Sequence, residues 1–463
     1  MPLSEAGPAR PLHDDAQLDR RAILALVAIL TGVALGTLDT AIANTALPTI
    51  AGDLKAPPAA SIWVINAYQL AVVATLLPFA TLGDLLGPRR VFMAGLAVFT
   101  AASLACALAG SLPTLAAARA LQGVGAGGIM SVNIALIRLI YPASRLGRGV
   151  GMNALVVGVG FAVGPTLASL ILTLAPWPWL FAVNVPLGLA ALALGLRALP
   201  RSERRQHSFD PLTAGLTALT FASLIGALGS AAQREPLGLV ALPLGLCLVA
   251  GAALLWRQRG HPAPMLPVDL LARPMFLLST LTAMGSFAAQ GLAFVSLPFY
   301  FEEVLHRDPV QTGFLMSSWP IVVAAAAPIA GRLSDRHPPG LLGGIGLAIM
   351  CVGLASMALL PDNPSALNIV LRMAVCGAGF GFFQSPNLRA LMSSAPPERA
   401  GGASGMVGMA RLIGQTTGAA LVALCFGLVG THGSVAALAL GAVFAALAAA
   451  ASSARLWAAR PPI

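Results

Sequence analysis

The sequence has too little charge for a protein surrounded by water. Only 10% of its 463 residues are Asp, Glu, Lys or Arg, whereas about 25% is usual in soluble domains. Hydrophobic residues make up 57% of the chain, and the mean hydropathy is +0.84. These values exclude a large polar surface and leave no room for a sizeable soluble domain. They predict an all-α polytopic membrane protein.

Cysteine and the signatures of common enzymes are also scarce. The five cysteines lie inside apolar stretches without a Cys-x-x-Cys spacing, which argues against a disulfide framework or a metal site. No HExxH, GxSxG, Walker or glycine-rich nucleotide signature is present, so neither an enzyme nor a cofactor is expected. The first 21 residues lack a short apolar core with a cleavage site, so no cleaved signal peptide is expected.

Apolar segments long enough to cross a bilayer recur along nearly the whole chain. A helix needs about 20 apolar residues to span a hydrocarbon core of about 30 Å. Fourteen such segments are predicted, near 22–46, 60–83, 91–110, 114–138, 149–172, 179–199, 211–231, 236–256, 275–300, 312–332, 340–360, 366–391, 403–429 and 434–457. Only four residues separate 211–231 from 236–256, and without this pair the count would be twelve.

The net charge of +10 follows the positive-inside rule. Of the 27 basic residues, Arg119, Arg372 and Arg411 lie in the interior of predicted spans, and Lys55, Arg234 and Arg307 lie in loops on the far side of the membrane. The others lie in tails, in loops or at span ends on the side of the N-terminus. We therefore expect both termini in the cytoplasm, a location in the inner (cytoplasmic) membrane, and contact with the lipid bilayer but not with nucleic acid.

The chain repeats itself at an offset of 254 positions. Nine residues in a 34-residue stretch recur at this offset, among them Asn133 with Asn387 and Gly164 with Gly418. Two parallel six-helix repeats are therefore predicted at 22–199 and 275–457, after a cytoplasmic tail at 1–21. The segment 200–260 would be a linker that adds two further helices.

Loop motifs resemble those of a known transporter family. Residues 80–90 read Ala-Thr-Leu-Gly-Asp84-Leu-Leu-Gly-Pro-Arg89-Arg90, and residues 331–336 read Gly-Arg-Leu-Ser-Asp335-Arg336. Both are similar to the cytoplasmic signature of the major facilitator superfamily, although Ala80 and Leu85 depart from it. The resemblance implies the major facilitator fold and a conformational latch formed by these acids and arginines; an ordinary positive-inside loop is the alternative.

An arginine is expected inside the membrane. Arg119, Gln122 and the following glycines resemble the Arg-x-x-Gln-Gly-x-Gly signature of the same superfamily. Such a charge costs roughly 2.5 kcal/mol or more unless it is paired or hydrated. Asp39 is the only acid plainly inside a predicted span. It lies nine residues before Pro48, at the outer end of the first span, and Arg119 lies six residues after Pro113, at the outer start of the fourth span. At ~1.5 Å per residue, both side chains lie in the outer half of the membrane. An ion pair between Asp39 and Arg119 is therefore predicted.

Two further groups of residues resemble signatures of exporters. Gly160, Gly164 and Pro165 match the antiporter signature Gly-x-x-x-Gly-Pro, which we expect at the contact between the halves; generic helix packing is the alternative. Residues 38–48, 63–70 and 177–188 are similar to signatures of the fourteen-span drug:proton antiporter family. That resemblance implies proton coupling through Asp39, Arg119 and, as a further candidate, Glu302. The predicted substrate-cavity residues are Asn44, Tyr68, Gln69, Gln122 and Gln290.

The sequence thus predicts an antiporter that exports hydrophobic or amphipathic small molecules in exchange for protons by alternating access. A proton symporter for uptake of small organic solutes is the main alternative; the antiporter signature and the fourteen spans argue against it. A transporter-like membrane sensor or enzyme is a remote alternative, because no soluble output domain is predicted. The resemblance makes a monomer the default expectation.

Overall fold

The computed structural model describes residues 19–141, 146–200, 210–232, 235–258, 268–396 and 400–458. Within these ranges the regular structure is entirely helical. Fourteen helical segments are long and apolar enough to cross a membrane, as the sequence predicts. Residues 1–18 of the expected tail, and parts of the expected linker, lie outside the described residues.

The first six spans are formed by eight helices. These are α1 (Arg20–Asp53), α2 (Pro58–Ser61), α3 (Trp63–Leu86), α4 (Pro88–Ala107), α5 (Leu112–Ile140), α6 (Leu146–Leu174), α7 (Trp179–Ala182) and α8 (Asn184–Ala198). Two of the spans combine a short helix with a long one, α2 with α3 and α7 with α8. The helix α1 runs beyond the predicted limit at residue 46 because it accommodates Pro48 in its interior.

The remaining eight spans begin with a pair, α9 (Pro211–Ala232) and α10 (Leu237–Gln258). They continue, after the short α11 (Val268–Leu271), with α12 (Pro274–Phe299), α13 (Pro309–Leu333), α14 (Pro339–Ala358), α15 (Ala366–Ser393), α16 (Ala400–Val429) and α17 (Gly433–Ala458). A π-helical turn at Tyr300–Val304 extends α12. A 3₁₀ turn at Gly430–His432 joins α16 to α17.

The helices begin where the sequence supplies starting signals. Proline occupies the first position of α4, α12, α13 and α14, where its missing N–H loses no helical hydrogen bond. Ser111 forms a capping box with Thr114 at the start of α5. The Asp308 carboxylate accepts a hydrogen bond of 2.8 Å from the backbone N–H of Gln311 in α13. These signals fix where the helices begin, so that short connections separate most of the spans.

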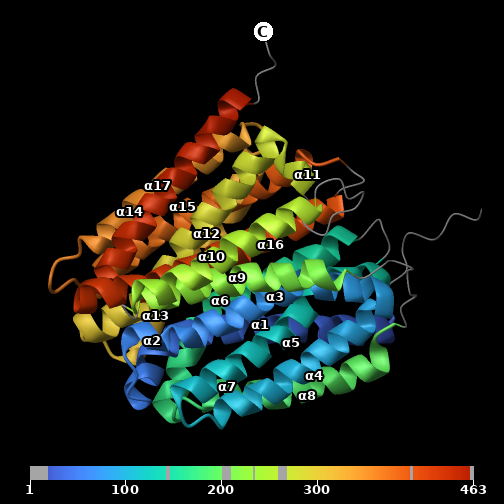
Figure 1. The fold of residues 1–463 in the computed structure, drawn as a ribbon, viewed down its shortest axis with the longest axis horizontal. Coiled ribbons are helices and arrows are strands. Elements are labelled where there is room, and N and C mark those ends of the chain that lie inside the picture. Colours follow the sequence, from blue (N-terminus) through green and yellow to red (C-terminus); the bar gives the residue numbers. More distant parts are fainter. Residues whose placement is uncertain are drawn as a thin grey trace, which may run out of the picture.

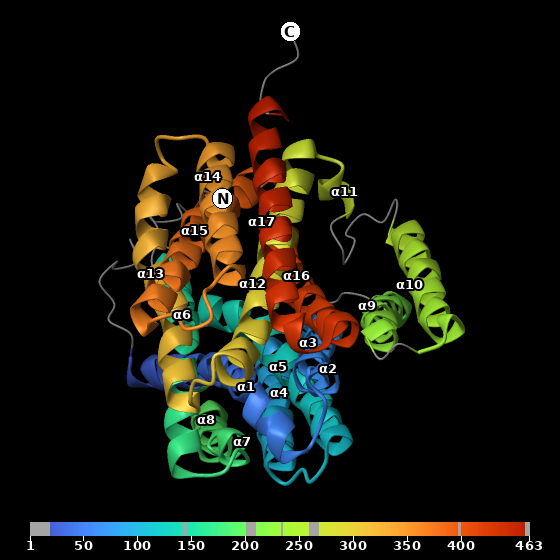
Figure 2. The same cartoon turned by 90° about the vertical axis from the view of Figure 1, so that its left-hand side faces the viewer.

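The helices form two groups with a pair on one flank. Figure 2 shows α1 to α8 on one side, α12 to α17 on the other, and α9 with α10 beside them. The packing pairs recur between the groups: α3 and α4 pack on α5 as α13 and α14 pack on α15, and α1 packs on α6 as α12 packs on α16. These recurring pairs are the counterpart in space of the sequence repeat.

The pair on the flank contacts the two groups through one helix. The helix α9 packs against α3 and α16, whereas α10 packs mainly on α9 (Figure 1). Only 11% of the most apolar window of α10 is buried. The exposed leucines of α10 therefore face the surroundings of the protein, as a lipid-facing helix requires.

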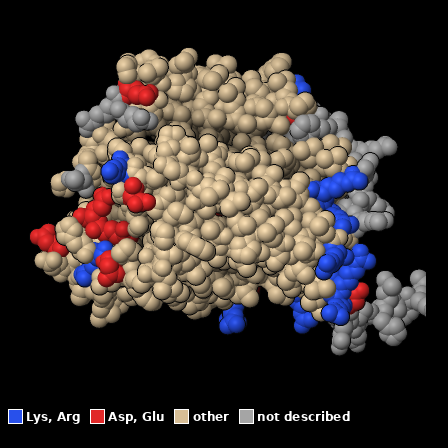
Figure 3. Space-filling view, turned by 90° about the horizontal axis from the view of Figure 1, so that it is seen from below, with Lys and Arg blue, Asp and Glu red and all other residues tan. Residues whose placement is uncertain are grey.

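The two ends of the bundle carry opposite charge. Figure 3 shows acidic side chains gathered at one end and basic ones at the other. The acidic end comprises the connections α1–α2, α12–α13 and α14–α15, with Asp53, Glu302, Glu303, Asp308 and Asp362. The basic end comprises the starts of α1, α4 and α12 and the ends of α5 and α8, with Arg20, Arg21, Arg89, Arg90, Arg138, Arg197 and Arg273. The charged ends flank an apolar middle, which is the pattern of a protein that crosses a bilayer.

Candidate functional site

A buried ion pair joins α1 to α5. The carboxylate of Asp39 accepts a hydrogen bond from the guanidinium of Arg119, and both side chains are only 1% exposed. Burying two charges is costly unless other hydrogen bonds satisfy the remaining polar atoms. The predicted partners therefore meet inside the membrane-spanning part of the molecule.

Neutral polar side chains complete the coordination of Asp39. Gln122 donates to Asp39 Oδ1 at 2.8 Å, and Asn184 donates to the same oxygen at 3.0 Å. The Gln122 side chain also accepts from Arg119 and donates to the Ser103 hydroxyl at 2.9 Å. We call Asp39, Arg119, Gln122 and Asn184 the ionic network. Three-residue spacing places Arg119 and Gln122 on one face of α5, which lets both reach the same carboxylate.

The Arg119 guanidinium is satisfied on its other sides as well. Its Nε donates to the carbonyl oxygen of Val64 at 3.1 Å. Its central carbon lies 4.2 Å from the ring centroid of Tyr68 and 5.4 Å from that of Phe181. Aromatic faces attract a desolvated cation. Arg119 is thus held by α1, α3, α5 and α7 together.

Small cavities lie between the two groups of helices, next to the ionic network. One is lined by Thr40, Asn44, Gln69, Phe161, Gln290, Gly291, Phe294, Val295 and Gln415. Another, of about 40 Å³, is lined by Gly36, Thr37, Thr40, Tyr68, Gln69, Val72, Met130, Val157, Phe161, Arg411, Leu412 and Gln415; we call it the central cavity. Both are far smaller than the roughly 300 Å³ or more of a ligand pocket. The described conformation is therefore contracted around this space.

Four of the five predicted cavity residues line these spaces. Asn44, Gln69 and Gln290 line the first cavity, and Tyr68 lines the central one with Gln69. The buried side-chain oxygen of Asn44 has no hydrogen-bond partner. Gln122 differs from the prediction, because the described cavities do not include it and its amide belongs to the ionic network.

Three polar residues have no role in the sequence prediction: Asn184 and Arg455 are buried, and Arg411 is partly buried. Asn184 contacts Asp39, and its place in the 177–188 motif was the available signal. Arg411 lines the central cavity; it was noted only as a basic residue inside a span. Arg455 was counted with the loops and tails, yet it is 1% exposed in α17 and donates to Ser279, Asn387 and Ser452. Nothing in the sequence signals that Arg455 is buried although Trp457, two residues further on, is exposed.

The antiporter motif packs mainly inside one half. A Cβ atom at Gly164 would lie 2.4 Å from the Cβ of Ala41 in α1, and one at Gly160 would lie 3.0 Å from Thr37. The prediction that Gly164 lies between the halves is therefore wrong for this conformation. The other face of α6 does reach the second half: the Pro165 carbonyl oxygen and Ser169 lie against Gly313 of α13. Close approach requires small residues at such contacts.

Among the described residues of the second half, no buried ion pair corresponds to the ionic network. Arg372, which occupies the repeat position of Arg119, donates to the carbonyl oxygens of Ser356 and Leu359. These carbonyls lie at the C-terminal end of α14, where backbone carbonyls lose their i+4 partners; the Ser356 carbonyl also accepts from the Leu359 N–H at 3.3 Å. Arg372 therefore serves as a cap, whereas Arg119 pairs with an acid.

Glu302 lies far from the ionic network along α1, at the acidic end. It belongs to the π-helical turn that extends α12 and approaches Thr49 of α1. One of its carboxylate oxygens is buried without a hydrogen-bond partner. Single π-helical turns are frequent at functional sites.

The two predicted latches differ in the described conformation. Asp335 forms an ion pair with Arg389 of α15, a partner that the sequence did not suggest. In the first half Asp84 is exposed, and Arg89 donates to the Leu196 carbonyl oxygen at 2.7 Å. Arg90 and Arg336 lie exposed at the basic end.

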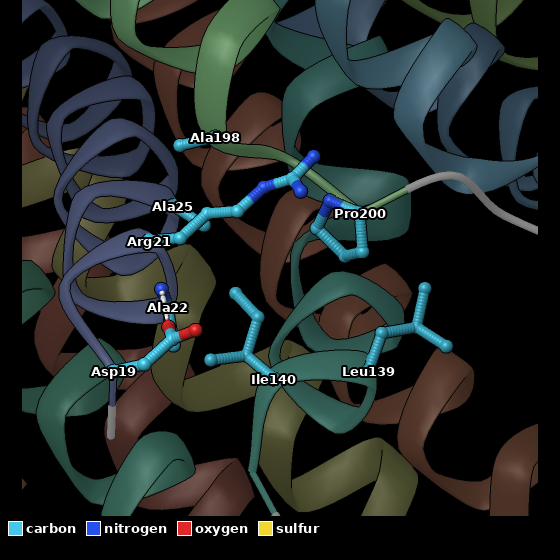
Figure 4. A pocket seen from close by; sticks show the side chains of 8 residues that line it. All are labelled: Asp19, Arg21, Ala22, Ala25, Leu139, Ile140, Ala198 and Pro200. Atoms are coloured by element: carbon cyan, nitrogen blue, oxygen red, sulfur yellow. Dashed lines mark hydrogen bonds between the residues drawn. The ribbon is translucent and has the colours of Figure 1, made fainter.

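A separate pocket of about 600 Å³ opens at the basic end (Figure 4). It lies between the ends of α1, α5 and α8, where the Arg21 side chain extends toward Pro200. Its lining contains none of the residues of the ionic network.

Comparison with known proteins agrees with this architecture. Residues 29–419 match the family model described as Major Facilitator Superfamily. The chain is 53% identical to the uncharacterized transporter YebQ of Escherichia coli K12, over 91% of this chain and 93% of that protein. It is 31% identical to the riboflavin transporter RibZ of Clostridioides difficile, over 82% of each.

Two further similarities concern drug resistance and fold. The chain is 30% identical to the multidrug resistance protein Stp of Mycobacterium tuberculosis, over 88% of this chain and 76% of that protein. A solved bacterial homolog of the human lysosomal transporter Spinster, in an inward-facing and unoccupied conformation, superposes with a TM-score of 0.69 at 16% identity. That alignment covers 96% of this chain and all of the other.

Proposed function

Because this chain belongs to the Major Facilitator Superfamily and is therefore a membrane transporter, we propose that it is a proton-coupled antiporter that exports amphipathic small molecules. The observation that carries this proposal is the buried Asp39–Arg119 pair beside the central cavity. Asp39 is a titratable group inside the spans, and Tyr68 connects its partner Arg119 to the cavity wall. The resistance protein Stp among the relatives supports a drug or metabolite as the exported molecule.

The proposed coupling uses the making and breaking of the ion pair. A proton that reaches Asp39 neutralises the carboxylate and removes its attraction for Arg119. The released guanidinium would then pull on Tyr68 and on the Val64 backbone, which it contacts from α5. A change at Asp39 would thereby alter the cavity wall. Glu302 remains a second candidate for proton transfer at the acidic end.

We further propose how the molecule is oriented and how it moves. The basic end would face the cytoplasm, because positively charged loops are retained there. Residues 22–199 and 275–457 would form the two moving halves, and 200–260 the linker. Asp84, Arg89 and Arg90, with Asp335 and Arg336, would form latches that break as the halves move. The working unit would be a monomer in the cytoplasmic membrane.

Transport in membrane vesicles of known orientation tests the proposal. A proton gradient is imposed, and the movement of a fluorescent amphipathic substrate is followed. Antiport moves the substrate against the direction of proton flow, whereas a symporter, the main alternative, moves both in the same direction. Asp39→Asn should abolish gradient-driven movement, because an amide of the same shape cannot titrate.

The matched control is Asp53→Asn. Asp53 lies in the same helix and accepts a hydrogen bond of 2.6 Å from the Trp177 indole, but it is exposed at the acidic end. This variant should transport like the parent protein at equal amounts of folded protein. If Asp39→Asn still builds a substrate gradient from a proton gradient, coupling through Asp39 is excluded and Glu302 becomes the next residue to replace.

A further inference from the structure

Arg411 is the only charged residue in the lining of the central cavity. It lies in α16, 11 positions after the first residue of that helix, or about 16 Å along it at 1.5 Å per residue. Residues of α1, α3, α5 and α6 line the other sides of the same space. The guanidinium thus belongs to the second half and faces a cavity whose remaining walls come from the first.

Arg411, which is partly buried, differs from the buried arginines Arg119 and Arg455 in having no partner among the described residues. Arg119 is paired with Asp39, and Arg455 donates to three polar side chains or carbonyls. Within the described residues, Arg411 makes no hydrogen bond, ion pair or ring contact, and no charged group lies close enough to act on it. A charge inside a span without such partners is expensive even when it is only partly buried. Its retention in a cavity wall indicates that something outside the chain binds it.

The surroundings of Arg411 define the chemistry of that ligand. Gln415 lies one helical turn further on the same face and lines the same cavity. Apolar side chains of α5 and α6, Met130, Val157 and Phe161, line it as well. A planar guanidinium with neighbouring amides matches a carboxylate or similar oxyanion, and the apolar wall matches a hydrophobic body.

We infer that Arg411 binds the anionic group of the exported molecule, so that the preferred substrates are amphipathic anions. This inference rests on the proposed exporter function and adds the charge of the substrate to it. In the described conformation the cavity, at about 40 Å³, has room for water but not for such a ligand. Substrate binding therefore requires α16 to move away from α3, α5 and α6.

Equilibrium binding to three dansyl compounds tests the inference. Dansylglycine carries a carboxylate, dansylamide is neutral and dansylcadaverine is a cation, while the apolar ring system is the same. Equilibrium dialysis of the protein in nanodiscs against empty nanodiscs corrects for partition into lipid. We expect the parent protein to bind dansylglycine about 10- to 100-fold more tightly than dansylamide, as a charge-assisted hydrogen bond would give. Dansylcadaverine should bind most weakly.

Substitutions assign this preference to Arg411. In Arg411→Gln the affinity for dansylglycine should fall to that for dansylamide, while dansylamide binding stays unchanged and reports an intact cavity. Arg411→Lys should keep part of the preference, because it keeps the charge but not the planar fork. The matched control is Arg372→Gln, another arginine inside a span, which bonds only backbone carbonyls outside the cavity; it should bind like the parent.

The outcomes separate this inference from the proposed function. A parent protein that binds dansylglycine no more tightly than dansylamide overturns the inference, and so does an Arg411→Gln variant with unchanged preference. Proton-driven export of dansylamide would leave the proposed function intact in either case. Conversely, an Arg411-dependent preference for the anion together with proton-independent transport would retain the inference and overturn the proposed coupling.

Discussion

The guanidinium carbon of Arg119 lies 4.2 Å from the centroid of the Tyr68 ring. Tyr68 also lines the central cavity, so that a single side chain touches both the ionic network and the space proposed for the substrate. Its hydroxyl donates to the Gly36 carbonyl oxygen over a long 3.3 Å. The ring, and not the hydroxyl, therefore makes the main contact between the two sites.

Replacement of Tyr68 should distinguish these two parts of the side chain. Tyr68→Phe keeps the ring over Arg119 and should retain proton-driven export within about threefold, since one neutral hydrogen bond contributes roughly 0.5–1 kcal/mol. Tyr68→Leu removes the cation–π contact, which contributes up to about 2 kcal/mol when desolvated, and should lower export by about tenfold. Vesicle transport at equal protein amounts measures both. Equal loss in the two variants would assign the effect to the hydroxyl instead.

The buried Asp39–Arg119 pair predicts that removing both charges restores stability but does not restore proton-coupled transport. Asp39→Asn leaves the Arg119 charge without its counterion, which is expected to cost about 3–5 kcal/mol and to lower the midpoint of thermal unfolding. Adding Arg119→Gln removes that charge, so the double variant should regain much of the midpoint. It should still fail to couple transport to protons, because no titratable group returns.

The same double variant tests the alternative of a permanent structural pair. A purely structural role requires transport to return together with stability when both charges are removed. Measurement of unfolding and of vesicle transport on the same preparations decides between the two roles. Restored proton-driven export in the double variant would exclude coupling by titration of Asp39.

The contact between α1 and α6 predicts a rescue experiment. A methyl group at Gly164 would overlap the Ala41 side chain, so Gly164→Ala should destabilise the protein by about 1–3 kcal/mol. Ala41→Gly in the same chain creates the missing space and should restore the unfolding midpoint. Gly158→Ala is the control, because a Cβ atom there would have no neighbour within 4 Å apart from the backbone of its own helix. An unchanged midpoint in Gly164→Ala would show that the helices are not this close.

The contact between α6 and α13 predicts a shift in conformation. A Cβ atom at Gly313 would lie 1.9 Å from the Ser169 hydroxyl, so Gly313→Ala should force the halves apart at the acidic end. A penalty of about 1–3 kcal/mol changes a two-state balance by roughly 5- to 150-fold. Distances between spin labels at positions 174 and 359, two exposed sites at the acidic end, should lengthen. Gly331→Ala in the same helix has space and should leave these distances unchanged.

Sequence reasoning was most successful for features that depend on position along the chain. The fourteen spans follow from apolar runs and their starting signals, and the depth of Asp39 and Arg119 in their spans predicted that they meet. The direction in which a side chain leaves its helix is not fixed by depth. The sequence therefore predicts Gln122 in the cavity, although its amide donates to Asp39. It also predicts Gly164 against the second half, although a side chain at this position would meet Ala41 of α1.

The sequence predictions also differ from the structure for charged residues near the ends of helices. Arg455 lies near the end of the last predicted span, 434–457, and the sequence prediction counts it with the basic tail, because only tertiary packing places Ser279 and Asn387 around it. Asp335 likewise forms an ion pair with Arg389 of α15, a helix that is distant in the sequence. Such partners are set by how α12, α13, α15 and α17 pack, which local sequence patterns do not encode.

The position of α9 has a consequence for the role of the surrounding bilayer. A Cβ atom at Gly427 of α16 would lie 1.9 Å from the Ala232 carbonyl oxygen at the end of α9, while Gly229 of α9 lies against Trp63 of α3. If α3 and α16 separate during transport, α9 must slide or tilt, and α10 must move with it. Since α10 is largely exposed, lipid has to be displaced along its length. Hydrophobic thickness and lateral pressure of the membrane would then contribute to the energy of the transport cycle.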